Sequence, residues 1–115
     1  MQPILFLLKP NFTDANIGDA RLFYCPHCAM IEGVLHYYPD LRTLIDIRYV
    51  DFPRPRPAII ELIGEENQGC PVLILPRDSV IPNGFKAIGA YMFSDEKMVI
   101  ATYLAEHFHI GFWHP

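Results

Sequence analysis

The chain has 115 residues, 51% of them hydrophobic, and a formal net charge of −4 at pH 7. This length predicts a single domain, residues 1–115, with enough apolar side chains for one hydrophobic core. The scattered positive charges argue against a nucleic-acid surface, and no run of about 18 apolar residues predicts a membrane-spanning helix.

The chain opens with a short apolar run at residues 4–9, which predicts a strand buried on both faces. The segment has neither the basic start nor the small-residue cleavage site of a signal peptide, so we expect a cytoplasmic protein. Residues 10–24 contain Pro, Asn, Asp and Gly and predict a long loop. Loops of this length are uncommon inside compact domains and often carry function.

A helix is predicted to begin at Pro26, because proline suits the first helical turn, where its missing N–H costs nothing. Apolar residues then recur at helical spacing, and the pattern ends before Pro39. Residues 44–52 alternate apolar and charged side chains and predict a strand. The proline-rich residues 53–57 form a stiff connector, and Pro57 opens a second helix that Gly64 closes.

Residues 71–75 predict another buried strand. A turn region follows, and then a short strand or strand fragments within residues 85–92. Ser94 is the expected N-cap of a C-terminal helix that continues to Gly111. The order of elements is therefore β-α-β-α-β-β-α. It predicts an α/β fold with a four-stranded mixed sheet flanked by helices, in which the first strands are parallel.

Two of the three cysteines, Cys25 and Cys28, stand three residues apart at the start of the first helix. In a reducing compartment this spacing indicates redox or metal chemistry more than a structural bridge. Unpaired N–H groups and the helix dipole should stabilise a Cys25 thiolate, with Cys28 one turn deeper. His27 can add positive charge beside Cys25. A stabilised thiolate predicts a relatively oxidising couple.

These features together resemble the thioredoxin superfamily: the CxxC after the first strand, a Cys-Pro dipeptide opening the third strand, and the C-terminal helix. The Cys25-Pro26-His27-Cys28 tetrad is similar to that of DsbA-type disulfide oxidases. The second half of the chain resembles the glutathione-binding domain of glutathione transferases and glutaredoxins. The "FYCPHC" and "GEENQ" segments resemble a small bacterial family of thioredoxin-like proteins of unknown function.

The resemblance implies that Cys25 is the exposed nucleophile, Cys28 the resolving thiol and Pro71 a cis-proline that faces them. Tyr24 stands where thioredoxins have Trp, and Cys70 stands before the expected cis-proline, where Thr or Val is common. Cys70 is interpreted either as a small buried hydrophobic side chain or as a third thiol near the pair, which traps a mixed disulfide or pairs with Cys28.

Three hypotheses follow for the function. The first is a thiol–disulfide oxidoreductase that uses Cys25 and Cys28 on protein or small-molecule thiols and disulfides. The second is a non-enzymatic thioredoxin-fold module for a partner protein or for glutathione, which Cys70, Ser94 and Asp95 would hold. The third is a glutathione-dependent reductase, and a metal site on the cysteines is a further alternative. No dedicated cofactor is expected, and the aromatic residues of the C-terminal tail suit a monomer or a weak homodimer.

Overall fold

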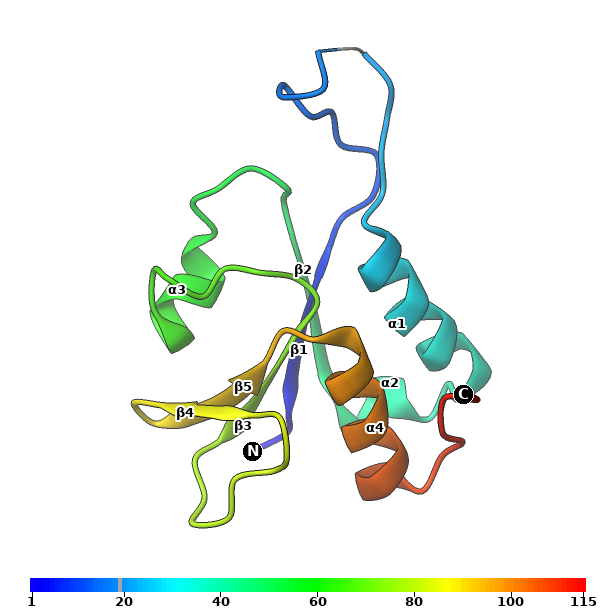
Figure 1. Ribbon diagram of the computed structural model, residues 1–115, viewed down its shortest axis with the longest axis vertical. Helices are drawn as coiled ribbons and strands as arrows, with labels where there is room; N and C mark the ends of the chain where they lie inside the picture. Colours follow the sequence, from blue (N-terminus) through cyan, green and yellow to red (C-terminus); the bar gives the residue numbers. More distant parts are fainter. Residues whose placement is uncertain (19) are drawn as a thin grey trace.

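The computed structural model describes residues 1–18 and 20–115 as a mixed five-stranded sheet flanked by helices (Figure 1). The strand order is β2-β1-β3-β5-β4, in which β1 and β2 are parallel and the other neighbours are antiparallel. The elements are β1 (Ile4–Leu8), α1 (Pro26–Tyr37), α2 (Leu41–Leu44), β2 (Asp46–Val50), α3 (Pro57–Ile63), β3 (Val72–Pro76), β4 (Lys86–Ile88), β5 (Tyr91–Ser94) and α4 (Lys97–Phe108).

The predicted α/β fold with a mixed sheet is confirmed, and strands β2-β1-β3-β5 have the order expected of a thioredoxin-like arrangement. The predicted number of four strands is wrong, because residues 85–92 contain most of a β4–β5 hairpin instead of one strand. The extra strand β4 has only three residues, none of them buried, and lies at the sheet edge. So short and exposed a strand leaves no hydrophobic pattern in the sequence.

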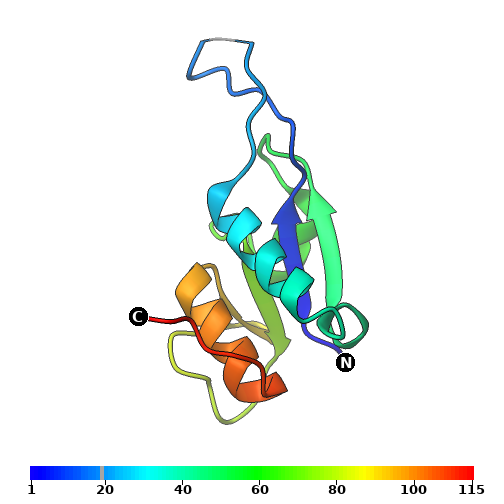
Figure 2. The same cartoon turned by 90° about the vertical axis from the view of Figure 1, so that its right-hand side faces the viewer.

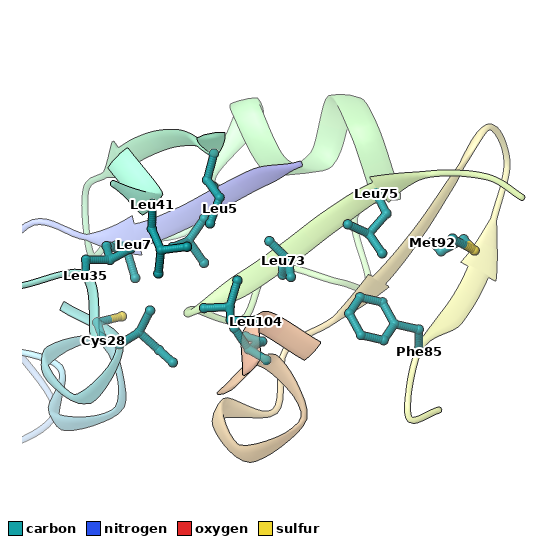
Figure 3. Packing of buried hydrophobic residues seen from close by; sticks show 13 residues of the cluster. Leu5, Leu7, Cys28, Leu35, Leu41, Leu73, Leu75, Phe85, Met92 and Leu104 are labelled. Atoms are coloured by element: carbon teal, nitrogen blue, oxygen red, sulfur yellow. The ribbon is translucent and has the colours of Figure 1, made fainter. Parts of the chain in front are cut away.

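Strand β1 lies inside the sheet and sends alternate side chains to the two faces. Leu5 and Leu7 pack in a core cluster with α1, α2 and α4, which Figure 3 shows. Ile4 and Phe6 pack on the opposite face with α3. The side view in Figure 2 shows α1 and α4 on the same side of the sheet. Burial on both faces explains why β1 reads as a continuous apolar run.

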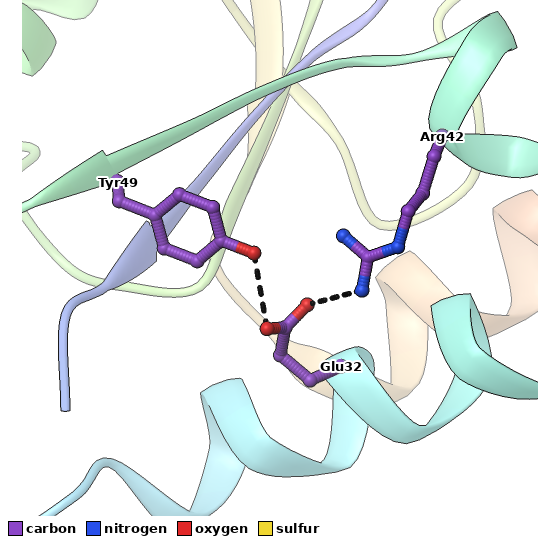
Figure 4. A network of polar contacts seen from close by, with 3 residues as sticks. All are labelled: Glu32, Arg42 and Tyr49. Atoms are coloured by element: carbon purple, nitrogen blue, oxygen red, sulfur yellow. Dashed lines mark hydrogen bonds and ion pairs between the residues drawn. The ribbon is translucent and has the colours of Figure 1, made fainter. Parts of the chain in front are cut away.

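A polar network on Glu32 ties α1 to the neighbouring elements (Figure 4). One carboxylate oxygen of Glu32 accepts a hydrogen bond from the Arg42 guanidinium at 3.1 Å, and the other accepts one from the Tyr49 hydroxyl at 3.0 Å. Arg42 lies on α2 and Tyr49 on β2. The network therefore fixes the position of α1 over the parallel β1–β2 pair. The short helix α2 was not predicted, since four residues are too few for a helical period.

The start and end predicted for the C-terminal helix are both wrong. Ser94 is the last residue of β5 and is buried, and the N-cap of α4 is Glu96. The Ser94 hydroxyl instead accepts a hydrogen bond from the Glu96 N–H at 3.3 Å. The helix ends at Phe108, because His109 adopts a left-handed conformation with φ 58°. Two polar residues, Asp95 and Glu96, thus separate β5 from α4.

Residues 10–18 and 20–24 form an arm that projects beyond the end of the sheet (Figure 1). Residue 19, within the predicted loop, lies outside the described residues. Phe12 and Phe23 pair in a short antiparallel bridge at the base of the arm. The Phe12 ring stacks on Phe52 at 4.2 Å between centroids, so the arm is anchored to the connector that follows β2. Within the described part of the chain, none of the helices has the length and hydropathy needed to cross a bilayer.

Candidate functional site

Cys25 lies at the mouth of the site, as the N-cap residue of α1. Its Sγ accepts a hydrogen bond from the Cys28 backbone N–H at 3.2 Å. Proline at position 26 favours this geometry, because its ring fixes a helical φ directly after the cap. The side chain of Cys25 is half-buried. The sulfur therefore accepts a hydrogen bond from an N–H group that has no partner within the helix, and the residue remains partly exposed to solvent.

Cys28 lies one turn further into α1 and is buried, with 3% of its surface exposed. Its Sγ accepts a hydrogen bond from the backbone N–H of Leu8, the last residue of β1, at 3.4 Å. Burial raises the pKa of the Cys28 thiol well above its ordinary value, and the nearby Cys25 raises it further. The two thiols are thus close together but have different surroundings.

The Cys70–Pro71 peptide bond is cis, as predicted, and its segment faces the two cysteines. The Cys25 thiol lies 3.9 Å from the Cys70 carbonyl oxygen, to which it can donate a weak hydrogen bond. Cys70 is half-buried and packs against the hydrophobic clusters on both faces of the sheet. Burial raises the pKa of its thiol to about 11, although the positive charge of Arg56 acts in the opposite direction. Cys70 is therefore a partly buried side chain, and its backbone carbonyl adjoins Cys25.

Arg56 supports the segment that carries Cys70, and the sequence analysis missed it. Its guanidinium donates hydrogen bonds to the Gln68 carbonyl at 2.6 Å and to the Phe52 carbonyl at 3.1 Å. Its backbone N–H donates to the Gln68 side-chain oxygen at 2.7 Å. Arg56 is 6% exposed, although the proline-rich residues around it predict a solvated connector. No sequence signal distinguished Arg56, because Arg54 also stands between two prolines and is exposed.

The other predicted residues of the motif are exposed. Tyr24, Pro26 and His27 all face solvent around Cys25, and the Tyr24 side chain is 66% exposed. Within the described residues, no hydrogen bond joins His27 to either cysteine sulfur. These residues therefore form the rim of the site.

The two residues predicted to hold glutathione lie in different environments. Asp95 is exposed and close to the Cys70 segment, since a Cβ atom placed on Gly69 would lie 3.1 Å from its Oδ2. Ser94 is 4% exposed and its hydroxyl already accepts the Glu96 N–H. The expectation that Ser94 and Asp95 occupy the start of the helix is wrong, because α4 begins at Lys97.

The alternative of a metal site gains no support from the donor geometry. In residues 1–18 and 20–115, no group of three or more His, Cys, Asp or Glu side chains converges as metal ligands do. Cys25, Cys28 and Cys70 are all free thiols.

The fold and the site together define an α/β protein of thioredoxin-like arrangement with a close CxxC pair at a helix start. Residues 2–112 match the family described as "Protein of unknown function (DUF3088)", and the chain belongs to that family. Neither the curated proteins nor the solved structures contain a match to this chain.

Proposed function

We propose that the protein is a thiol–disulfide oxidoreductase that uses Cys25 as nucleophile and Cys28 as resolving thiol. The observation that carries this proposal is the hydrogen bond from the Cys28 N–H to the Cys25 Sγ at the N-terminus of α1. This N–H and the positive end of the helix dipole stabilise negative charge on the attacking sulfur.

The chemistry proceeds in two exchanges. The Cys25 thiolate attacks one sulfur of a substrate disulfide, forming a mixed disulfide and releasing the other substrate sulfur as a thiolate. Cys28 then loses its proton and attacks the Cys25 sulfur, which releases the second substrate thiol and closes the Cys25–Cys28 disulfide. The Leu8 N–H, 3.4 Å from the Cys28 Sγ, supports the thiolate needed for this second step.

The partners of the proposed reaction are proteins or small molecules that carry thiols or disulfides. A reducing cytoplasm suits free cysteines, and the net charge of −4 supports a function without nucleic acid. For the oligomeric state we propose a monomer or weak homodimer, with Phe112 and Trp113 as the exposed aromatic residues that would meet in the dimer.

The experiment that tests the proposal counts free thiols in buffers of graded glutathione redox potential. The wild-type protein should lose two thiols together in a reversible transition. Cys25→Ser and Cys28→Ser should each abolish that transition, whereas Cys70→Ser, the matched control, should retain it. If Cys25 and Cys28 never form a reversible disulfide, the oxidoreductase proposal fails and a non-enzymatic binding module becomes the better explanation.

A further inference from the structure

A cationic cavity next to the proline-rich residues 53–57 has no part in the chemistry described above. It has a volume of about 490 Å³ and is lined by Lys9, by the end of β2 and by the proline-rich residues 53–57. Lys9 directly follows β1, whose last residue, Leu8, contacts the Cys28 sulfur. The cavity therefore opens at the same end of the sheet as the dithiol. Its volume suits a small molecule rather than a macromolecule.

The charge of this cavity is opposite in sign to that of the whole chain. Lys9, Arg54 and Arg56 line it together with one carboxylate, Asp51, so its side chains carry a net charge of +2, while the chain carries −4. Asp51 pairs with Lys9 at 3.2 Å. Within the described residues, neither arginine has a carboxylate within ion-pair distance.

Arg56 also contacts the segment before Cys70, because its guanidinium donates a hydrogen bond to the Gln68 carbonyl at 2.6 Å. Burial raises the pKa of the Cys70 thiol, and the positive charges of Arg56 and Arg54 both oppose that rise. The backbone carbonyl of Cys70 lies 3.9 Å from the Cys25 Sγ. The arginine-lined cavity therefore adjoins the segment whose Cys70 carbonyl faces the attacking sulfur.

We propose that this cavity binds a carboxylate group of a small disulfide substrate and that Arg54 is the residue that selects for its charge. The proposal rests on the proposed function, since it names the substrate class of the same cysteine pair. A guanidinium presents two parallel N–H donors that match the two oxygens of a carboxylate. Arg56 is held by the Phe52 and Gln68 carbonyls and contributes its charge, whereas the exposed Arg54 is free to move onto the ligand.

The reaction that the cavity would favour is the first exchange. The Cys25 thiolate forms a bond to one sulfur of the disulfide RS–SR, the S–S bond breaks, and RS⁻ leaves with the electron pair and takes a proton from water. The carboxylate of the R group that remains bound to Cys25 then lies against Arg54. Oxidant and reductant are the substrate disulfide and the protein dithiol, so no other reagent is needed.

The test compares three small disulfides on the reduced wild-type protein: the anionic 3,3′-dithiodipropionate, the neutral bis(2-hydroxyethyl) disulfide and the cationic cystamine. Chromatography follows the release of the thiol half of each probe. Each rate is divided by the rate of the same probe with N-acetylcysteine amide, which removes differences in intrinsic reactivity. The variant is Arg54→Gln. The control is Arg77→Gln, which removes the same charge from an exposed residue just beyond the far end of β3.

The wild-type protein should prefer the anionic probe over the neutral one by about three- to tenfold, the size expected for one partly screened charge pair. Arg54→Gln should remove most of this preference, Arg77→Gln should keep it, and 1 M NaCl should abolish it, because the Debye length falls to about 3 Å. Equal normalised rates for all probes, or equal losses in both variants, would overturn the cavity proposal and leave the oxidoreductase intact. A protein that reacts with none of the three probes would overturn both.

Discussion

The sulfur of Cys25 and the backbone N–H of Cys28 are joined by a hydrogen bond of 3.2 Å across the first turn of α1. This hydrogen bond is local, but the surroundings of the two sulfurs depend on distant parts of the chain. The last residue of β1 contacts the sulfur of Cys28, and the segment before β3 places the Cys70 carbonyl opposite Cys25. The site is therefore formed by three segments: the end of β1, the start of α1 and the segment before β3.

Alkylation should distinguish the three cysteines. Cys25 should react first with iodoacetamide at pH 7, because it is half-buried at the helix start, while burial raises the pKa of both Cys28 and Cys70. Peptide mass spectrometry after timed quenching gives the three rates. In the unfolded protein all three rates should be similar, which serves as the control. A folded protein in which Cys28 reacts before Cys25 would contradict the assigned roles.

Alkaline pH should destabilise the protein through Cys70. Burial raises the pKa of this thiol from 9.0 to about 11. Between these values the unfolded chain releases the proton and the folded protein keeps it, so the unfolded state binds fewer protons and the free energy of unfolding falls as pH rises. We expect a loss of up to about 2 kcal/mol, present in full above pH 11 and absent below pH 9.

Urea unfolding from pH 8 to 11 would measure this loss. Cys70→Ala should make the free energy of unfolding fall less steeply with pH. Some decline should remain, because burial also raises the pKa of Cys28 and this destabilises the folded protein at alkaline pH in the same way. If the free energy of unfolding depends on pH equally in the wild type and in Cys70→Ala, the raised pKa assigned to Cys70 would be wrong.

Removing the Arg56 side chain should destabilise the fold. Arg56→Met deletes the hydrogen bonds to the Phe52 carbonyl, which is partly buried, and to the Gln68 carbonyl, which is buried. We expect a loss of about 2–4 kcal/mol in the free energy of unfolding. Arg54→Met, at an exposed position of the same connector, should change it by no more than about 0.5 kcal/mol. Urea unfolding of both variants measures the difference, and equal values would contradict the structural role of Arg56.

Two glycines should respond in opposite directions to alanine. Gly84 has φ +85°, and a Cβ atom there would lie 2.8 Å from both Cγ atoms of Val99, so Gly84→Ala should cost about 2 kcal/mol or more. Gly33 lies within α1 with no heavy atom within 4 Å of an added Cβ. Gly33→Ala should therefore stabilise the protein by roughly 0.5–1 kcal/mol. Thermal unfolding of the two variants gives the comparison. A destabilised Gly33→Ala protein would show that the space beside Gly33 on α1 is occupied.

Several parts of the fold could be predicted because they follow from local chemistry. Proline at 26 and 57 starts α1 and α3, and Gly64 ends α3 with φ +91°. The predicted cis bond before Pro71 is present, and here the prediction came from a family resemblance. The Ser94 prediction failed because the residue has good capping chemistry but is held in β5 by pairing with Leu73. A strand partner outweighs an N-cap preference of about 1 kcal/mol.

The sequence by itself determined the alternation of strands and helices, the position of the CxxC at a helix start and the burial of β1, because each depends on neighbours within a few residues. Only the tertiary structure decided that Arg56 is buried and that Phe12 stacks on Phe52. These contacts join segments far apart in the chain. Their geometry depends on strand order and loop path, which no short stretch of sequence contains.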